Sequence, residues 1–151
     1  MEITTEMIKL LRDSTGVSVM ECKKALEAAG GDMDKARAVL SERAAVVLSK
    51  KADRALQAGT VGAYVHATGQ VGALVLLLCE TDFVSKNEGF TLLARDIAMH
   101  AAAMRPENTE ALLAQSFIKD EGKTIADLIA DGTQKFGERI MLESFSVFSV
   151  Q

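Results

Sequence analysis

The sequence predicts an α+β fold in which an N-terminal three-helix bundle is followed by a three-stranded antiparallel sheet packed with helices. Apolar residues recur at helical spacing between glycine turns in residues 1–42, two strand-like segments follow residue 58, and another ends the chain behind a helical stretch. Strand, strand, helices, strand is an order typical of an antiparallel sheet. We therefore predict a three-helix module at 1–42, a connecting helix at 43–58 and an α+β core domain at 59–151.

The composition limits what such a protein can do. Its 151 residues are enough to bury a core, which must consist of aliphatic and Met side chains because Trp is absent and only 5% of the residues are aromatic. The net charge of −4 argues against a nucleic-acid binder that depends on phosphate contacts. We expect no direct contact with nucleic acid.

Cysteine usage and hydropathy disfavour two further classes of protein. Cys22 falls in a helical pattern and Cys79 on a predicted strand, so reduced thiols are expected rather than a disulfide. The first residues lack the basic and apolar parts of a signal peptide, and the apolar run at 71–78 is too short to span a bilayer. We expect a cytoplasmic protein that does not bind membranes.

Each helix of the predicted bundle has a start signal, and glycines follow the first two. The predicted caps are Thr4, Ser18 with Glu21 as a capping box, and Asp32, and the predicted stops are Thr15-Gly16 and Gly30-Gly31. The predicted inner faces are Ile3, Met7, Leu10 and Leu11, then Cys22, Ala25, Leu26 and Ala29, then Met33, Ala36, Val39 and Leu40. The module resembles the small ubiquitin-associated (UBA-like) type, which binds partners and carries no chemistry.

The core domain opens with a predicted hairpin. Residues 60–67 alternate in polarity, Thr68-Gly69-Gln70 makes a turn, and the second strand runs over residues 71–80. Because residues 71–78 are apolar at both parities, this strand is expected to be buried on both faces.

Helices and a third strand complete the predicted domain. Asn87 is placed to cap a long helix, a short helix is expected around residues 110–115, and Thr124 starts another with a variant capping box. The predicted third strand at 140–150 places Ile140, Leu142, Phe148 and Val150 on one parity and Met141, Phe145 and Val147 on the other. A sheet this apolar needs cover on both faces, and its own helices can cover one, so the other is expected to meet a second copy or a partner.

The most informative stretch follows the second strand, where the sequence reads Glu80-Thr81-Asp82-Phe83-Val84-Ser85-Lys86. A firmly buried strand is a rigid mount, so Asp82 and Phe83 at its end are presented at a fixed place. An aromatic on a connecting segment often fills a pocket of another molecule. In the alternative, Phe83 folds back to cap its own core, which is the commoner behaviour of apolar side chains.

An enzymatic function would use Cys79, Glu80, Asp82, His66 and His100. The two histidines lie on separate predicted elements, and the sequence has neither a phosphate-binding loop nor a metal-ligand cluster. A lone histidine on an apolar helix stripe, such as His100, is usually a satisfied interior residue. We expect no catalysis, no metal and no cofactor.

Two motifs resemble the elongation factor Ts family. Residues 15–26 (TGVSVMECKKAL) closely resemble the signature near the start of the family's sequences. Residues 79–87 (CETDFVSKN) resemble the family's second signature. Residues 117–125 (FIKDEGKTI) are similar too, and the likeness covers nearly the whole chain with the motifs in the family's order.

The resemblance implies a guanine-nucleotide exchange factor, without a chemical step, for elongation factor Tu in its GDP-bound and nucleotide-free forms. A partner that prefers the nucleotide-free form must weaken nucleotide binding by the same factor. In this family an Asp-Phe pair, matched here by Asp82 and Phe83, wedges into the GTPase near its Mg²⁺ site, and the N-terminal module contacts a GTPase helix. The partner-binding residues implied by the resemblance are Lys9, Arg12, Val19, Met20, Lys23, Thr81, Asp82, Phe83 and Val84.

Departures from the family pattern leave an alternative open. Val19 stands where the family commonly has Met, Glu21 where it has Asp, and the stretch between Met104 and Leu112 is shorter than in short members with a single core unit. Such short members pair through the sheet, which implies a homodimer that holds two molecules of elongation factor Tu. The alternative is a shortened paralogue that acts as a binding module without exchange activity, although the intact Thr81-Asp82-Phe83 argues against lost exchange.

Overall fold

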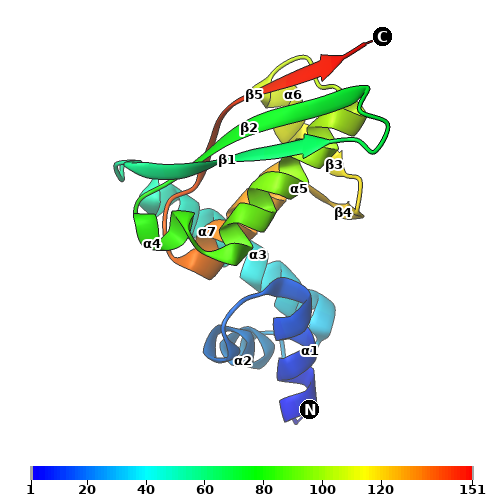
Figure 1. Ribbon diagram of the computed structural model, residues 1–151. Helices are drawn as coiled ribbons and strands as arrows, with labels where there is room; N and C mark the ends of the chain where they lie inside the picture. Colours follow the sequence, from blue (N-terminus) through cyan, green and yellow to red (C-terminus); the bar gives the residue numbers. More distant parts are fainter. Residues whose placement is uncertain (1, 151) are drawn as a thin grey trace.

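The computed structural model describes residues 2–150, except for the side chains of residues 48 and 49, so Met1 and Gln151 at the ends of the predicted ranges lie outside it. The described residues form a small unit of three helices and a larger unit of sheet and helices (Figure 1). The third helix of the small unit is long and joins it to the larger one. The predicted α+β class and the three-stranded antiparallel sheet are confirmed.

The N-terminal unit contains α1 (Thr5–Thr15), α2 (Val19–Ala28) and the first part of α3 (Met33–Lys51). Its caps follow the predictions only in part. The Thr4 hydroxyl accepts from the Met7 amide and the Asp32 carboxylate from the Lys35 amide, as predicted. The buried side chains of its core are Leu11, Val17, Cys22, Ala25, Leu26, Ala36 and Leu40.

Two predictions for this unit are wrong. Ser18 accepts from the Glu21 amide, but the Glu21 carboxylate pairs with Arg43 at 3.1 Å instead of returning to the cap, because a cation of α3 lies within its reach. Leu10 is 61% exposed whereas Leu11 is fully buried, since successive helical residues point in different directions and only one faces this narrow core.

The connecting helix is also not a separate element. The third predicted helix continues without a break to Lys51, because neither glycine nor proline interrupts residues 33–51. It stops there, well before the predicted residue 58, and Ala58 already belongs to the first strand.

The main sheet consists of β1 (Ala58–Val65), β2 (Val71–Cys79) and β5 (Met141–Ser149) in the order β1-β2-β5. The first two strands form the predicted hairpin, and their turn is closed by Gly69 at a left-handed φ of 71°. Helix α5 (Glu88–Met104), capped by Asn87 as predicted, covers one face of the sheet. At Gly62 the backbone of α5 comes so near that an added Cβ would lie 2.5 Å from the Ala94 carbonyl.

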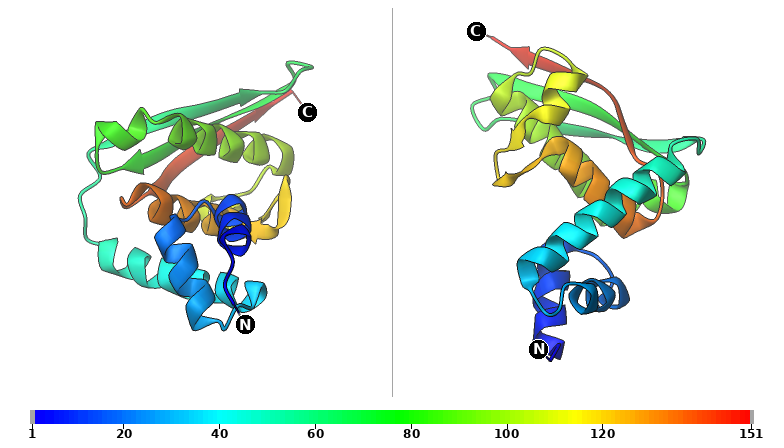
Figure 2. Two further views of the ribbon diagram at one scale, coloured as in Figure 1. Left: turned by 90° about the horizontal axis from the view of Figure 1, so that it is seen from below. Right: turned by 180° about the vertical axis from the view of Figure 1, so that it is seen from behind.

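The remaining elements lie around this sheet-and-helix pair. Helix α7 (Ile125–Phe136) begins with the predicted capping box of Thr124 and Asp127 and lies on the far side of α5 from the sheet (Figure 2). The other elements are α4 (Asp82–Ser85), α6 (Thr109–Ala114), β3 (Ser116–Phe117) and β4 (Asp120–Thr124). The pairing of β3 with β4 was not predicted, because both strands are short and β4 is polar.

The predicted grouping of β5 side chains is wrong because the strand contains an irregularity. The register shifts opposite Leu76 and Leu77, which places Leu142 beside Leu77 on the covered face and Phe148 beside Gly72 on the other. Residues of one parity therefore face opposite sides of the sheet before and after the shift.

The face of the sheet turned away from α5 is left uncovered by the chain's own described helices (Figure 2). Val61, Val65, Leu74 and Phe148 project from it and are between 46 and 70% exposed. As predicted, the helices cover only one face of an apolar sheet.

Candidate functional site

The segment that follows β2 presents one aromatic side chain outwards. Val75, Leu77 and Cys79 of β2 are buried, so the strand that carries the segment is fixed in the core. Within α4, Val84 and Ser85 are each 8% exposed, whereas Phe83 is 92% exposed. The alternative in which Phe83 caps its own core is therefore wrong.

Local hydrogen bonds explain the compact shape of this segment. The Ser85 hydroxyl donates to the Asp82 carbonyl at 3.2 Å, the Asn87 amide donates to the Val84 carbonyl, and the Asn87 side chain then caps α5. The Asp82 side chain is exposed, and among the described residues its carboxylate makes no hydrogen bond or ion pair. The segment thus exposes a carboxylate and a phenyl ring at successive positions of α4.

Glu138 holds the start of the segment, and sequence reasoning missed it. Its carboxylate accepts from the Glu80 amide at 3.1 Å, from the Thr81 amide at 2.9 Å and from the Thr81 hydroxyl at 2.5 Å. Glu138 lies 57 positions beyond Thr81 in the chain. The only local signal is an acid directly after Gly137, which ends α7, and such a signal does not reveal its partner.

The residues considered for catalysis are not gathered into one cluster. His66 contacts Tyr64 near the hairpin turn, whereas Cys79 lies at the other end of β2. Burial raises the pKa of the Cys79 thiol and the charge of Glu138 raises it further, and together they outweigh the opposing effect of the hydrogen bond with the backbone of Thr81. These effects keep the thiol protonated and poorly nucleophilic.

His100 is an interior residue, as predicted. Its Nδ1 accepts from the Ile118 amide, which places the proton on Nε2, where Gln115 accepts at 3.0 Å. Burial lowers the pKa of His100, and the hydrogen bond to Gln115 opposes this only in part. The neutral ring therefore serves as a structural link between α5 and the segment that carries β3.

The predicted N-terminal contact residues are exposed on the small unit. Lys9 and Arg12 lie on α1, and Val19, Met20 and Lys23 lie on the first turns of α2. Val19 is 51% and Met20 66% exposed, and the unpredicted Leu10 of α1 adds a third exposed apolar side chain to this unit. The structure does not bring this set together with Phe83, because the two sets lie in different units (Figure 1).

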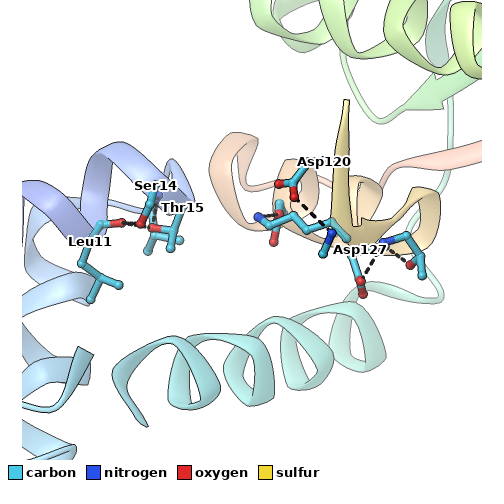
Figure 3. A network of polar contacts seen from close by, with 10 residues as sticks. Leu11, Ser14, Thr15, Asp120 and Asp127 are labelled. Carbon is cyan, nitrogen blue, oxygen red and sulfur yellow. Dashed lines mark hydrogen bonds and ion pairs between the residues drawn. The ribbon is translucent and has the colours of Figure 1, made fainter. Parts of the chain in front are cut away.

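A groove of about 580 Å³ separates the two units between the end of α1, α3 and the β4–α7 segment. Figure 3 shows its two walls, with Ser14 and Thr15 donating to the Leu11 carbonyl on one side and Asp120 and Asp127 on the other. Asp120 accepts from the Gly122 amide and Asp127 from the Thr124 amide. These four polar side chains thus bond within their own walls, and the groove lies between the two units.

Residues 2–150 contain no group of three or more His, Cys, Asp or Glu side chains placed to hold a metal ion. Within the same range, every helix is too short or too polar to cross a bilayer.

Comparison with known proteins gives consistent matches. Residues 80–151 match the family described as Elongation factor TS. The chain is 36% identical over 194 aligned positions to the elongation factor Ts of Thermodesulfovibrio yellowstonii, with 99% of this chain and 97% of the relative covered. It is 37% identical over 195 positions to that of Leptospira biflexa, which covers 99% of this chain and 98% of the relative.

A further relative, the elongation factor Ts of Acetivibrio thermocellus, is 41% identical over 155 positions, with 93% of this chain and 72% of the relative covered. The two longer alignments exceed the 151 residues of this chain, so those relatives carry segments that it lacks.

Proposed function

The chain belongs to the elongation factor Ts family, and on that basis we propose that it is a translation elongation factor that promotes the release of GDP from elongation factor Tu. It binds the GDP complex in the cytoplasm, stabilises the nucleotide-free form and leaves it ready for GTP. No bond is made or broken, because the effect is a coupling of two binding equilibria.

The exposed Phe83 is the observation that carries this proposal. A phenyl ring that is 92% exposed, although the next two residues are buried, has no role in the chain's own core. Inserted into the GTPase near its Mg²⁺ and nucleotide site, the ring is placed to displace groups around the ion, with the Asp82 carboxylate holding the displaced segment. Weakened Mg²⁺ coordination removes a large part of the electrostatic attraction for the diphosphate.

The other predicted residues have supporting roles. The N-terminal unit provides a second contact with the GTPase through the exposed residues Lys9, Arg12, Val19, Met20 and Lys23. Their exposure supports this role. Val84 is buried, so we assign it the role of anchoring α4 in the core, while Thr81 orients the start of that helix.

We also propose that the uncovered sheet face pairs with a second copy of the chain. Apolar side chains exposed over three adjacent strands are unusual in a protein that remains monomeric. Analytical ultracentrifugation should find a dimer for the wild-type chain and a monomer for Leu74→Glu, with Glu143→Lys on the same sheet as the control. A monomeric wild-type chain would overturn this part of the proposal.

The exchange activity is tested by the release of fluorescent GDP from elongation factor Tu in stopped flow. We expect strong acceleration by the wild-type chain and little by Phe83→Ala. Acceleration that is unaffected by the substitution would keep the function and overturn the wedge. Binding without acceleration would favour the shortened paralogue that acts as a binding module only.

A further inference from the structure

We propose that Glu138 is a positioning residue for nucleotide exchange, because it fixes the backbone that presents Asp82 and Phe83. The inference rests on the proposed function and deepens it. Three hydrogen bonds converge on the Glu138 carboxylate, and all come from Glu80 and Thr81, the two residues directly before α4. Hydrogen bonds to an ionised acceptor are roughly twice as strong as neutral ones, so this carboxylate is well suited to hold a loop.

The contact is reciprocal. The Glu80 carboxylate accepts from the Arg139 amide at 2.5 Å and lies 3.5 Å from the Arg54 guanidinium. Glu138 thus holds the backbone of Glu80, while Glu80 holds the backbone of the residue next to Glu138. Residues 80–81 and 138–139 are distant in sequence, and hydrogen bonds made by the carboxylates of Glu80 and Glu138 hold the two pairs together.

The Thr81 hydroxyl shows that this arrangement overrides an ordinary local preference. Thr81 is the N-cap of α4, a position where a threonine hydroxyl normally accepts from an amide of the helix it begins. Here the side chain makes no capping bond, and the hydroxyl donates to Glu138 instead. The start of α4 is therefore oriented by Glu138 rather than by its own cap.

The turn that carries Glu138 is itself anchored. Gly137 ends α7 at a left-handed φ of 74°, and its carbonyl accepts from the Lys51 ammonium at 2.5 Å. The Arg139 guanidinium donates to the Arg54 carbonyl at 2.8 Å. Glu138 thus connects the Phe83 segment to the end of α3 and the end of α7, which gives the carboxylate a firm support.

Phe83 needs such a support because its ring has almost no contacts of its own. Its place depends on the backbone of α4, which Val84 and Ser85 fix at the core and Glu138 fixes at the start. Without Glu138 the start of α4 samples other positions, and the partner must select the productive one. If only a fraction of the free molecules hold the segment in the conformation that binds, the apparent affinity for the partner falls in proportion to that fraction.

The test compares Glu138→Ala with Glu138→Gln, which keeps an oxygen to accept both backbone amides, and with the control Glu143→Ala on the exposed part of β5. Stopped-flow GDP release is measured against factor concentration. We expect Glu138→Ala to raise the concentration for half-maximal acceleration about tenfold, Glu138→Gln to restore most of it, and Glu143→Ala to have no effect.

A double-mutant cycle separates positioning from a general structural effect. If Glu138 acts through Phe83, Glu138→Ala should have little further effect in a Phe83→Ala chain. The inference would be overturned if Glu138→Ala weakened the acceleration of GDP release equally in the wild-type and Phe83→Ala chains. It would also be overturned if Glu138→Ala left the titration curve of the wild-type chain unchanged. If Glu138→Ala does not fold, Thr81→Val, which removes only the hydroxyl donor, replaces it with the same expected coupling to Phe83.

Amide hydrogen exchange in the free chain gives an independent reading. Glu138→Ala should speed exchange at Glu80 and Thr81 and leave Val75 and Leu77 of β2 protected. A wild-type chain that fails to accelerate GDP release would overturn the proposed function, and the inference with it. An active wild-type chain whose activity and amide protection are insensitive to Glu138→Ala would overturn the inference alone.

Discussion

The two regions proposed to contact elongation factor Tu both expose apolar side chains, but they are mounted in different ways. Phe83 stands on a one-turn helix that is anchored in the large core and fastened by Glu138. Val19 and Met20 stand on a small unit with its own core, which α3 joins to the rest across a groove. A rigid mount suits a group that must distort a partner, and a semi-independent unit suits one that only adds affinity.

The largest expected effect concerns the separate stability of the two units. Leu26→Ala and Leu77→Ala each remove a fully buried side chain, which costs about 3 kcal/mol in typical cores. Leu26→Ala should unfold the small unit alone, because a unit of roughly forty residues is marginally stable. Hydrogen exchange resolved by residue should show lost protection in α1 and α2 and retained protection in the sheet. Loss of protection in both units would show that they fold as one and would weaken the comparison.

The second prediction concerns the maximum rate of exchange. Phe83→Ala should lower the acceleration of GDP release at saturating factor by roughly thirtyfold, the size of an aromatic hot spot of about 2 kcal/mol. Its melting temperature should stay at the wild-type value because the ring is 92% exposed. A melting temperature that falls together with the rate would mean that Phe83 acts through the fold.

A smaller and different effect is expected from the N-terminal unit. Met20→Ala should raise the concentration for half-maximal acceleration by about fivefold, since it removes one partly exposed contact of about 1 kcal/mol. The rate at saturation should be unchanged. The same titration series serves as the readout, and a lower plateau for Met20→Ala would remove the division of roles between the two regions.

The smallest expected effect is a difference between the two units in how strongly acid lowers their stability. Both histidines of the chain lie in the larger unit, and burial lowers the pKa of His100 there. In the unfolded chain the histidine keeps a pKa near 6.5, so on acidification the unfolded chain binds the proton at a higher pH than the folded chain does. The stability that comes from the neutral ring is therefore complete above about pH 6.5 and is lost as the pH falls towards the pKa of the folded state. Urea unfolding should therefore show a lower midpoint for the larger unit at pH 5.5 than at pH 7.5. His100→Gln should reduce this difference, and a midpoint that rises on acidification would contradict the assignment.

The sequence was sufficient for features that depend on local signals. The caps at Thr4 and Asn87, the capping box at Thr124 and the hairpin turn at Gly69 all appear as predicted, because each depends on residues a few positions apart. The continuous apolar run of β2 likewise predicted a strand fixed in the core.

Features that depend on distant partners could not be read in the same way. The register shift in β5 is set by packing against β2, and nothing in residues 141–149 alone marks which side chains change face. The exposure of Phe83 ran against the usual burial of aromatic residues. Glu138 is recognisable only once the turn after α7 is known to lie beside Thr81.

The most direct test of the division between the two regions is a pair of affinities. Isothermal titration would measure binding of the wild-type chain, Phe83→Ala and Met20→Ala to elongation factor Tu in its GDP-bound and nucleotide-free forms. By linkage, the ratio of the two affinities equals the factor by which the chain weakens GDP binding. We predict that Phe83→Ala brings this ratio close to one, whereas Met20→Ala weakens both affinities equally and leaves the ratio unchanged. A ratio that Phe83→Ala leaves at its wild-type value would contradict the role of Phe83 as the exchange wedge.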